Sequence, residues 1–110
     1  MPGMKGEALK GHLEMLLLAA LRNGPAHGYG VINDLKSRSE GAFDLQEGTI
    51  YPALHRLERS GLVESQWSVE SGRRRRVYML TPKGGRMLEE KSAAWQSFSH
   101  ATTRALGTAA

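Results

Sequence analysis

The stretch of sequence that decides the fold runs from Gln46 to Thr81 and reads QEGTIYPALHRLERSGLVESQWSVESGRRRRVYMLT. Apolar residues recur at helical spacing over residues 47–59, and Gly61 then suits the left-handed end of a helix. Pro52 lies near the start of this helix, where a proline is tolerated. The stretch therefore begins with a short predicted helix.

Two strands are predicted after this helix, over residues 63–68 and 76–81, because both segments contain β-branched and aromatic residues. The polar turn between them covers residues 69–73. Four consecutive arginines, residues 73–76, lie at this turn and at the start of the returning strand. A short helix followed by a basic hairpin is typical of a winged helix-turn-helix, in which the helix enters the DNA major groove and the hairpin lies on the flanking backbone.

Length, composition and charge limit the class of protein. The 110 residues suffice for one small domain with one added element. The formal charge of +4 and the pI near 9.8 fit a polyanionic partner. The absence of cysteine excludes disulfides and thiolate sites. The longest apolar run, residues 15–21, is far shorter than the roughly 20 residues of a membrane span, and the N-terminus lacks the apolar core of a signal peptide. We therefore expect a soluble, cytoplasmic protein with no membrane partner.

Two further helices are predicted upstream of the opening stretch. The first follows a helical pattern that begins at Leu9 and ends before residues 24–25, which are Gly-Pro. Met15 and Leu18 fall outside its main apolar stripe, so this helix is apolar on more than one side. It therefore lies deep in a core or has a second protein partner. Another helix is predicted over residues 29–39.

A long last helix is predicted from Thr81 and Pro82, because threonine is a good N-cap and proline fits the first helical position. Gly84 and Gly85 each weaken its first turn by roughly 1 kcal/mol relative to alanine. The fold class is therefore mainly α with a small β-hairpin. We divide it into a winged helix-turn-helix DNA-binding domain and a C-terminal dimerisation helix, at residues 9–81 and 82–106.

Apolar residues on the first and last helices predict a protein partner. The last helix cannot fold back onto so small a domain without leaving apolar surface exposed, and the simplest partner is a second copy of the chain. Trp95 has two interpretations: a flat wall for a planar apolar effector at the dimer interface, or packing between subunits. The residues assigned to this effector or dimer interface are Met15, Leu18, Leu88, Trp95 and Phe98.

The polar side of the predicted helix 47–59 suits insertion into a DNA groove. Small and polar residues at a helix start can approach base edges, and the helix N-terminus favours a phosphate. The alternative is an amphipathic surface helix whose polar residues are only solvated. The candidate DNA-binding residues in this segment are Gln46, Thr49, Tyr51, Pro52, His55 and Arg56.

The four consecutive arginines, residues 73–76, are candidate DNA-binding residues. Clustered guanidinium groups on a projecting loop can neutralise phosphates and release counterions. The alternative is a charge cluster that aids solubility or protects a strand edge. Because alternate strand residues face opposite sides, we expect about half of the run to reach DNA. The arginines concerned are Arg73, Arg74, Arg75 and Arg76.

Tyr29, at the start of the second helix, is a further candidate. It either donates its hydroxyl to a phosphate or packs half-buried.

Nothing in the sequence predicts catalysis or a metal site. The four histidines show no metal-ligand spacing. No serine or carboxylate lies in a recognisable nucleophile or acid-base motif. We therefore expect no metal, no cofactor and no enzymatic activity.

Four segments follow one another along the chain: LKGHLEMLLLAAL, GPAHGYGV, LQEGTIYPALHRLERSGLV and SGRRRRVYMLTPKG. Taken in this order, they resemble the PadR family of bacterial transcriptional regulators. The resemblance extends over roughly residues 9–104. It implies a winged helix-turn-helix that dimerises through the C-terminal helix packed with the first helix, and a repressor that leaves a palindromic promoter site when a small molecule binds.

The single C-terminal helix resembles the compact subfamily that includes multidrug sensors. In some of these a tryptophan near the middle of the helix lines a drug pocket between subunits, and Trp95 lies at a similar place. The resemblance also implies that Gly72 and the arginines after it form the wing tip, and that Tyr29 faces DNA. The residues that it places in the recognition helix are Thr49, Tyr51, Pro52, His55 and Arg56.

We therefore expect a sequence-specific DNA-binding transcriptional regulator that acts as a homodimeric repressor. Its expected partners are double-stranded DNA with a palindromic operator, a second copy of the chain, and a small apolar or aromatic effector. The alternative is a winged-helix module for protein–protein interaction without DNA binding, since fold does not fix function.

Overall fold

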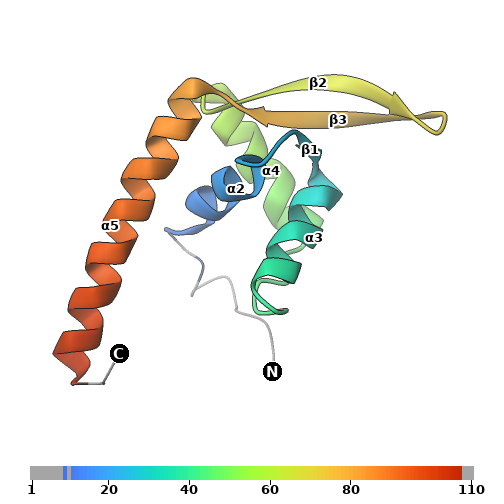
Figure 1. Cartoon of the computed structure of the whole chain (residues 1–110). Helices are drawn as coiled ribbons and strands as arrows, with labels where there is room; N and C mark the ends of the chain where they lie inside the picture. The colour runs from blue at the N-terminus through green and yellow to red at the C-terminus, as the bar shows by residue number, and fades with distance from the viewer. Residues whose placement is uncertain (1–8, 10, 108–110) are drawn as a thin grey trace.

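The computed structural model describes Leu9 and residues 11–107 of the chain, and its elements follow the order of a winged helix (Figure 1). Three helices come first, with a two-residue strand before the second, and a hairpin and a long helix follow. The prediction of a mainly helical winged helix with a small antiparallel sheet and a C-terminal helix is confirmed. The elements are α2 (Leu13–Leu21), β1 (Ala26–His27), α3 (Gly28–Arg38), α4 (Glu47–Arg59), β2 (Val63–Glu70), β3 (Arg73–Leu80) and α5 (Pro82–Leu106).

The core lies where α2, α3 and α4 meet the base of the hairpin. Each fully buried aliphatic side chain contributes roughly 1.5–3 kcal/mol through removal of apolar surface from water, so this cluster holds the helices in one body. The large side chains that are less than 2% exposed are Leu17, Leu18, Leu21, Val31, Ile50, Leu54, Leu57, Val63 and Tyr78.

Two residues predicted at a partner surface belong instead to this core. Leu18 is 0% exposed and Leu88 is 3% exposed within the single chain, so neither lies on a surface that a second copy could touch. Leu18 fell outside the apolar stripe of its helix because α2 is covered on more than one side. Leu88 anchors the first half of α5 to the same cluster.

The sheet has three antiparallel strands in the order β1-β3-β2. The strand β1 was not predicted, because two residues show no alternating pattern; it pairs Ala26 with Tyr78 and His27 with Val77. The hairpin is longer than predicted, since Ser71 and Gly72 alone form the turn, with φ of 51° and 77°. Positive φ at both turn residues matches the twist of the flanking strands. All four arginines therefore belong to β3 and not to the turn.

The helix boundaries follow from local capping. The helix predicted from Leu9 begins as α2 at Leu13, because Gly11, with φ of +86°, lies in a turn before it. Helix α3 begins at Gly28, one residue before its predicted start, and the imidazole of His27 caps it by accepting the backbone N–H of Gly30 at 3.2 Å. Helix α4 has the predicted bounds.

The start of α5 is fixed tightly to the base of the hairpin. The hydroxyl of Thr81 accepts the backbone N–H of Gly84 at 3.0 Å and donates to the carbonyl of Gly61 at 2.7 Å. A Cβ atom on Gly84 would lie 2.0 Å from the carbonyl oxygen of Leu62, so this glycine allows the helix to approach the chain closely. The C-terminal end of α5 runs clear of the other helices (Figure 1), and most of its side chains from Ala93 onward are exposed.

Candidate nucleic-acid interface

The outer face of α4 presents the predicted recognition residues to solvent. Its inner face is buried through Ile50, Ala53, Leu54 and Leu57. The N-terminus of the helix is open, since no atom of Leu9 or residues 11–107 would lie within 4 Å of a Cβ on Gly48. Five of the six predicted residues of this segment are exposed: Gln46, Thr49, Pro52, His55 and Arg56.

The sixth residue, Tyr51, is half-buried and packs against the start of α3. A Cβ atom on Gly28 would lie 2.4 Å from the ring and hydroxyl of Tyr51, so Gly28 leaves the space that the ring occupies. Tyr51 therefore fixes the position of α4 relative to α3 in addition to lining the surface.

The arginines of β3 differ in their surroundings. Arg73 and Arg74 are exposed, while Arg75 and Arg76 are half-buried. The guanidinium of Arg75 lies 3.0 Å from Nε2 of His27. The other ring nitrogen of His27 faces the N–H of Gly30. A neutral imidazole has one acceptor nitrogen, so it satisfies one of these two donors at a time, and Arg75 is held only weakly.

Arg76 is tied to α4. Its Nε donates to the hydroxyl of Ser65 at 2.8 Å, and its guanidinium lies 3.8 Å from the carboxylate of Glu58. The hydroxyl of Ser65 donates to the same carboxylate of Glu58 in α4. Such a partly exposed ion pair contributes at most about 1 kcal/mol, so its main effect is on geometry. It joins β3 to α4 through Ser65 and Glu58.

The arginines and both predicted tyrosines share one recess of about 490 Å³ between the hairpin and the start of α3. Tyr29 is 52% exposed there. Its hydroxyl donates to the carboxylate of Glu47, and this hydrogen bond and charge raise its pKa, so the hydroxyl stays protonated at neutral pH. Hydroxyl donors beside guanidinium groups can bind phosphate oxygens. The residues that line the recess are His27, Tyr29, Tyr51, Arg73, Arg74, Arg75 and Arg76.

His27 was not predicted as a residue of this site. It lies in the motif His-Gly-Tyr-Gly, which also contains Tyr29, and its position directly before α3 is that of an N-cap. Histidine is not among the residues most typical of that position, so its role as a cap that also contacts an arginine of β3 was not recognised.

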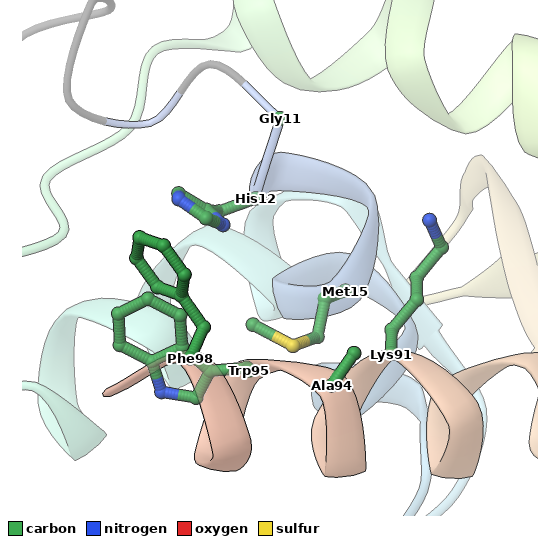
Figure 2. A pocket seen from close by; sticks show the side chains of 7 residues that line it. All are labelled: Gly11, His12, Met15, Lys91, Ala94, Trp95 and Phe98. Atoms are coloured by element: carbon green, nitrogen blue, oxygen red, sulfur yellow. The ribbon is translucent and has the colours of Figure 1, made fainter. Parts of the chain in front are cut away.

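The predicted effector residues Met15, Trp95 and Phe98 meet at a second recess, of about 330 Å³, between the start of α2 and the middle of α5 (Figure 2). The rings of His12 and Trp95 meet edge to face with centroids 5.2 Å apart, and those of Trp95 and Phe98 are 6.2 Å apart. Trp95 is 42% exposed and Phe98 is 62% exposed. His12, which closes one side of this recess, was not predicted from the sequence.

Two further observations apply to the described part of the chain. Across Leu9 and residues 11–107, no helix has both the length and the apolar character needed to cross a membrane. In the same residues, no three His, Asp or Glu side chains come together as a group that could hold a metal ion.

Comparison with known proteins gives the family. The model of the transcriptional regulator PadR-like family matches residues 17–90. The transcriptional regulator Rv3488 of Mycobacterium tuberculosis is 40% identical over 73 residues, which cover 66% of this chain and 65% of that protein.

Solved structures agree with this assignment. A PadR family transcriptional regulator from Eggerthella lenta is 34% identical with a TM-score of 0.78, covering 94% of this chain and 88% of that one. Bacillus subtilis PadR in complex with operator DNA is 24% identical with a TM-score of 0.65, covering 71% of this chain and 46% of that one, and shows the fold alone. The chain belongs to the PadR-like family of transcriptional regulators.

Proposed function

We propose that this PadR-family regulator binds double-stranded DNA sequence-specifically, with α4 in the major groove and β3 on the flanking backbone. The observation that carries the proposal is the shared recess of His27, Tyr29, Tyr51 and the arginines, residues 73–76. It lies between the hairpin and the start of α3, and Tyr51 of α4 also lines it, so phosphate contacts there would lie close to the base contacts of α4. A structural neighbour, Bacillus subtilis PadR, is bound to operator DNA, which supports this use of the fold.

The chain acts in this proposal as a homodimer joined through α5. Trp95 and Phe98 lie exposed on the half of α5 that leaves the core, where a second copy would cover them. A single winged domain buries little surface on DNA and binds weakly. Two domains joined at α5 can read the two halves of a palindromic operator, in successive major grooves about 34 Å apart.

Repression and its release follow from the same arrangement. A dimer on a promoter would block transcription. The recess at Trp95 is open on one side and near the lower end of the roughly 300–1,000 Å³ typical of ligand pockets, so a second copy would complete it. A small planar apolar or aromatic effector lying against Trp95 would change the angle between the two winged domains, and DNA affinity would fall.

Electrophoretic mobility shift with the DNA upstream of the chain's own gene tests this function. We expect a shifted band at low salt without effector, and loss of that band when a planar cationic dye that quenches Trp95 fluorescence is added. Absence of binding to any palindrome in that DNA would contradict repression of the chain's own gene. A selection of bound fragments from the whole genome would then identify other operator sites.

The protein–protein interaction module remains the second candidate function. One variant of the chain distinguishes it from DNA binding. Replacing the four arginines of β3 with glutamine should abolish DNA binding and its salt dependence. Binding to a protein partner through an apolar surface would be little affected by this change.

A further inference from the structure

We propose that Trp67 of β2 is itself a DNA-contact residue, whose indole ring packs on the sugar–phosphate backbone beside α4 between the guanidinium groups of Arg74 and Arg76. This inference rests on the proposed DNA-binding function and adds to it a residue outside the arginine run and the recognition helix.

The first observation is an exposed aromatic side chain in a polar hairpin. Trp67 is 56% exposed, although it is among the largest apolar side chains of the protein. The guanidinium carbon of Arg74 lies 4.5 Å from the centroid of a Trp67 ring, and that of Arg76 lies 5.1 Å from it. Cations at these distances are attracted to the ring face, so the indole is held in place before any partner arrives.

The second observation concerns the side of the hairpin on which Trp67 lies. Ser65 and Trp67 are two residues apart on β2 and share one face. The hydroxyl of Ser65 on that face is bonded to Glu58 of α4. Trp67 therefore lies on the side of the hairpin that faces the recognition helix. A DNA strand that borders the groove occupied by α4 would pass along this side.

Trp67, Arg74 and Arg76 together form a surface patch. The chemistry of this patch fits a polyanionic partner with an apolar component. The exposed guanidinium of Arg74 can pair with a phosphate, and the part of the indole that the arginines leave exposed matches the C–H surface of deoxyribose. The charge of Arg76 is already met by Glu58, so Arg76 serves as a positioning residue for the ring. The patch adjoins the arginine run of β3, in which Arg73 and Arg74 are exposed, and this local positive charge favours a polyanion over a protein partner.

Binding measurements separate the indole contact from the charge contact. The probe is a fluorescein-labelled duplex of mixed sequence, since backbone contacts do not depend on sequence. Trp67→Ala should weaken binding on the order of tenfold and leave the slope of log affinity against log salt unchanged. Arg74→Gln should reduce that slope by about one. Gln66→Ala, on the opposite face of the same strand, is the control and should bind as the unaltered chain does.

A second measurement uses the unaltered side chain and does not depend on how a variant folds. The chain is labelled with 5-fluorotryptophan, and its two fluorine resonances are assigned by comparison with Trp67→Phe. We expect the Trp67 resonance to shift when the duplex is added to saturation. If the chain binds the duplex but this resonance does not move and Trp67→Ala binds normally, this inference is overturned while DNA binding stands. If the unaltered chain does not bind the duplex at low salt, both proposals fail.

Discussion

At the scale of single residues, two glycines decide how closely the helices approach one another. Gly28 leaves room for the ring of Tyr51, and Gly84 leaves room for the carbonyl of Leu62. From the sequence alone, Gly84 predicts only a weak first turn of α5. The structure gives it a packing role that its neighbour Gly85 does not share, because a Cβ on Gly85 would meet nothing closer than a methyl of Leu80 at 4.0 Å.

This difference makes a matched pair of substitutions. Gly84→Ala should lower the free energy of unfolding by about 1–3 kcal/mol, because the added methyl group overlaps the Leu62 carbonyl. Gly85→Ala should raise it by about 1 kcal/mol, because alanine favours the helix and finds ordinary space. Urea unfolding followed by circular dichroism measures both. Equal effects of the two substitutions would show that α5 does not pack as described.

Tyr29 gives a prediction for alkaline pH. Its hydrogen bond to Glu47 raises its pKa above the ordinary value of 10.0, so the folded state holds this proton more tightly than the unfolded state does. The resulting stabilisation is fully present below the unfolded pKa and is lost as the pH rises through the folded one. Ultraviolet titration of the tyrosines should show that Glu47→Gln lowers the pKa of Tyr29. An unchanged titration would mean that the hydroxyl does not donate to Glu47.

At the scale of elements, local chemistry determined what could be predicted. Helix α4 was placed correctly because its apolar spacing and Gly61 mark both limits, and α5 because Thr81 and Pro82 mark its start. The strand β1 is set by pairing with β3, a contact between distant residues that no local pattern reports.

The same limit applies to the candidate site. The sequence identified the arginine run, but the difference between its members depends on His27 and Glu58, which come from other elements. Leu18 and Leu88 were placed at a surface because periodicity alone does not reveal how many neighbours cover a helix.

Helix α4 carries a prediction in which stability and the proposed DNA binding change in opposite directions. Gly48 lies exposed in the first turn of α4, and no atom of the described residues lies within 4 Å of a Cβ placed there. Gly48→Ala should raise the free energy of unfolding by up to about 1 kcal/mol. It should also weaken DNA binding, because the added methyl group lies where the helix N-terminus approaches the DNA backbone. Thermal unfolding and a mobility shift test the two parts, and unchanged DNA affinity would contradict the close approach of this turn.

At the scale of the whole molecule, the chain is elongated, with extents of 54 × 32 × 21 Å. The hairpin projects at one end of the sheet and α5 runs away from the helices on another side (Figure 1). The exposed aromatic residues of α5 and the recess at Trp95 suit a second copy, which would place two hairpins and two recognition helices on one surface.

Dimerisation can be tested without disturbing the core. Phe98 is 62% exposed in the single chain, so Phe98→Glu should leave the fold intact while it places a charge in the proposed interface. We expect sedimentation equilibrium to give a dimer for the unaltered chain and a shift toward monomer for this variant. Ser97→Glu, also at an exposed position, is the control for added charge and should remain dimeric. A monomeric unaltered chain would contradict the proposed dimer.

The most direct test of DNA binding through α4 and β3 is its salt dependence with and without the arginine run. The chain and a variant with glutamine at residues 73–76 are titrated onto the same upstream DNA fragment between low and physiological salt. We predict that the unaltered chain binds with an affinity that falls steeply with salt, and that the folded variant loses both the affinity and most of the slope. Equal affinity and equal slope for the two proteins would contradict the proposed interface.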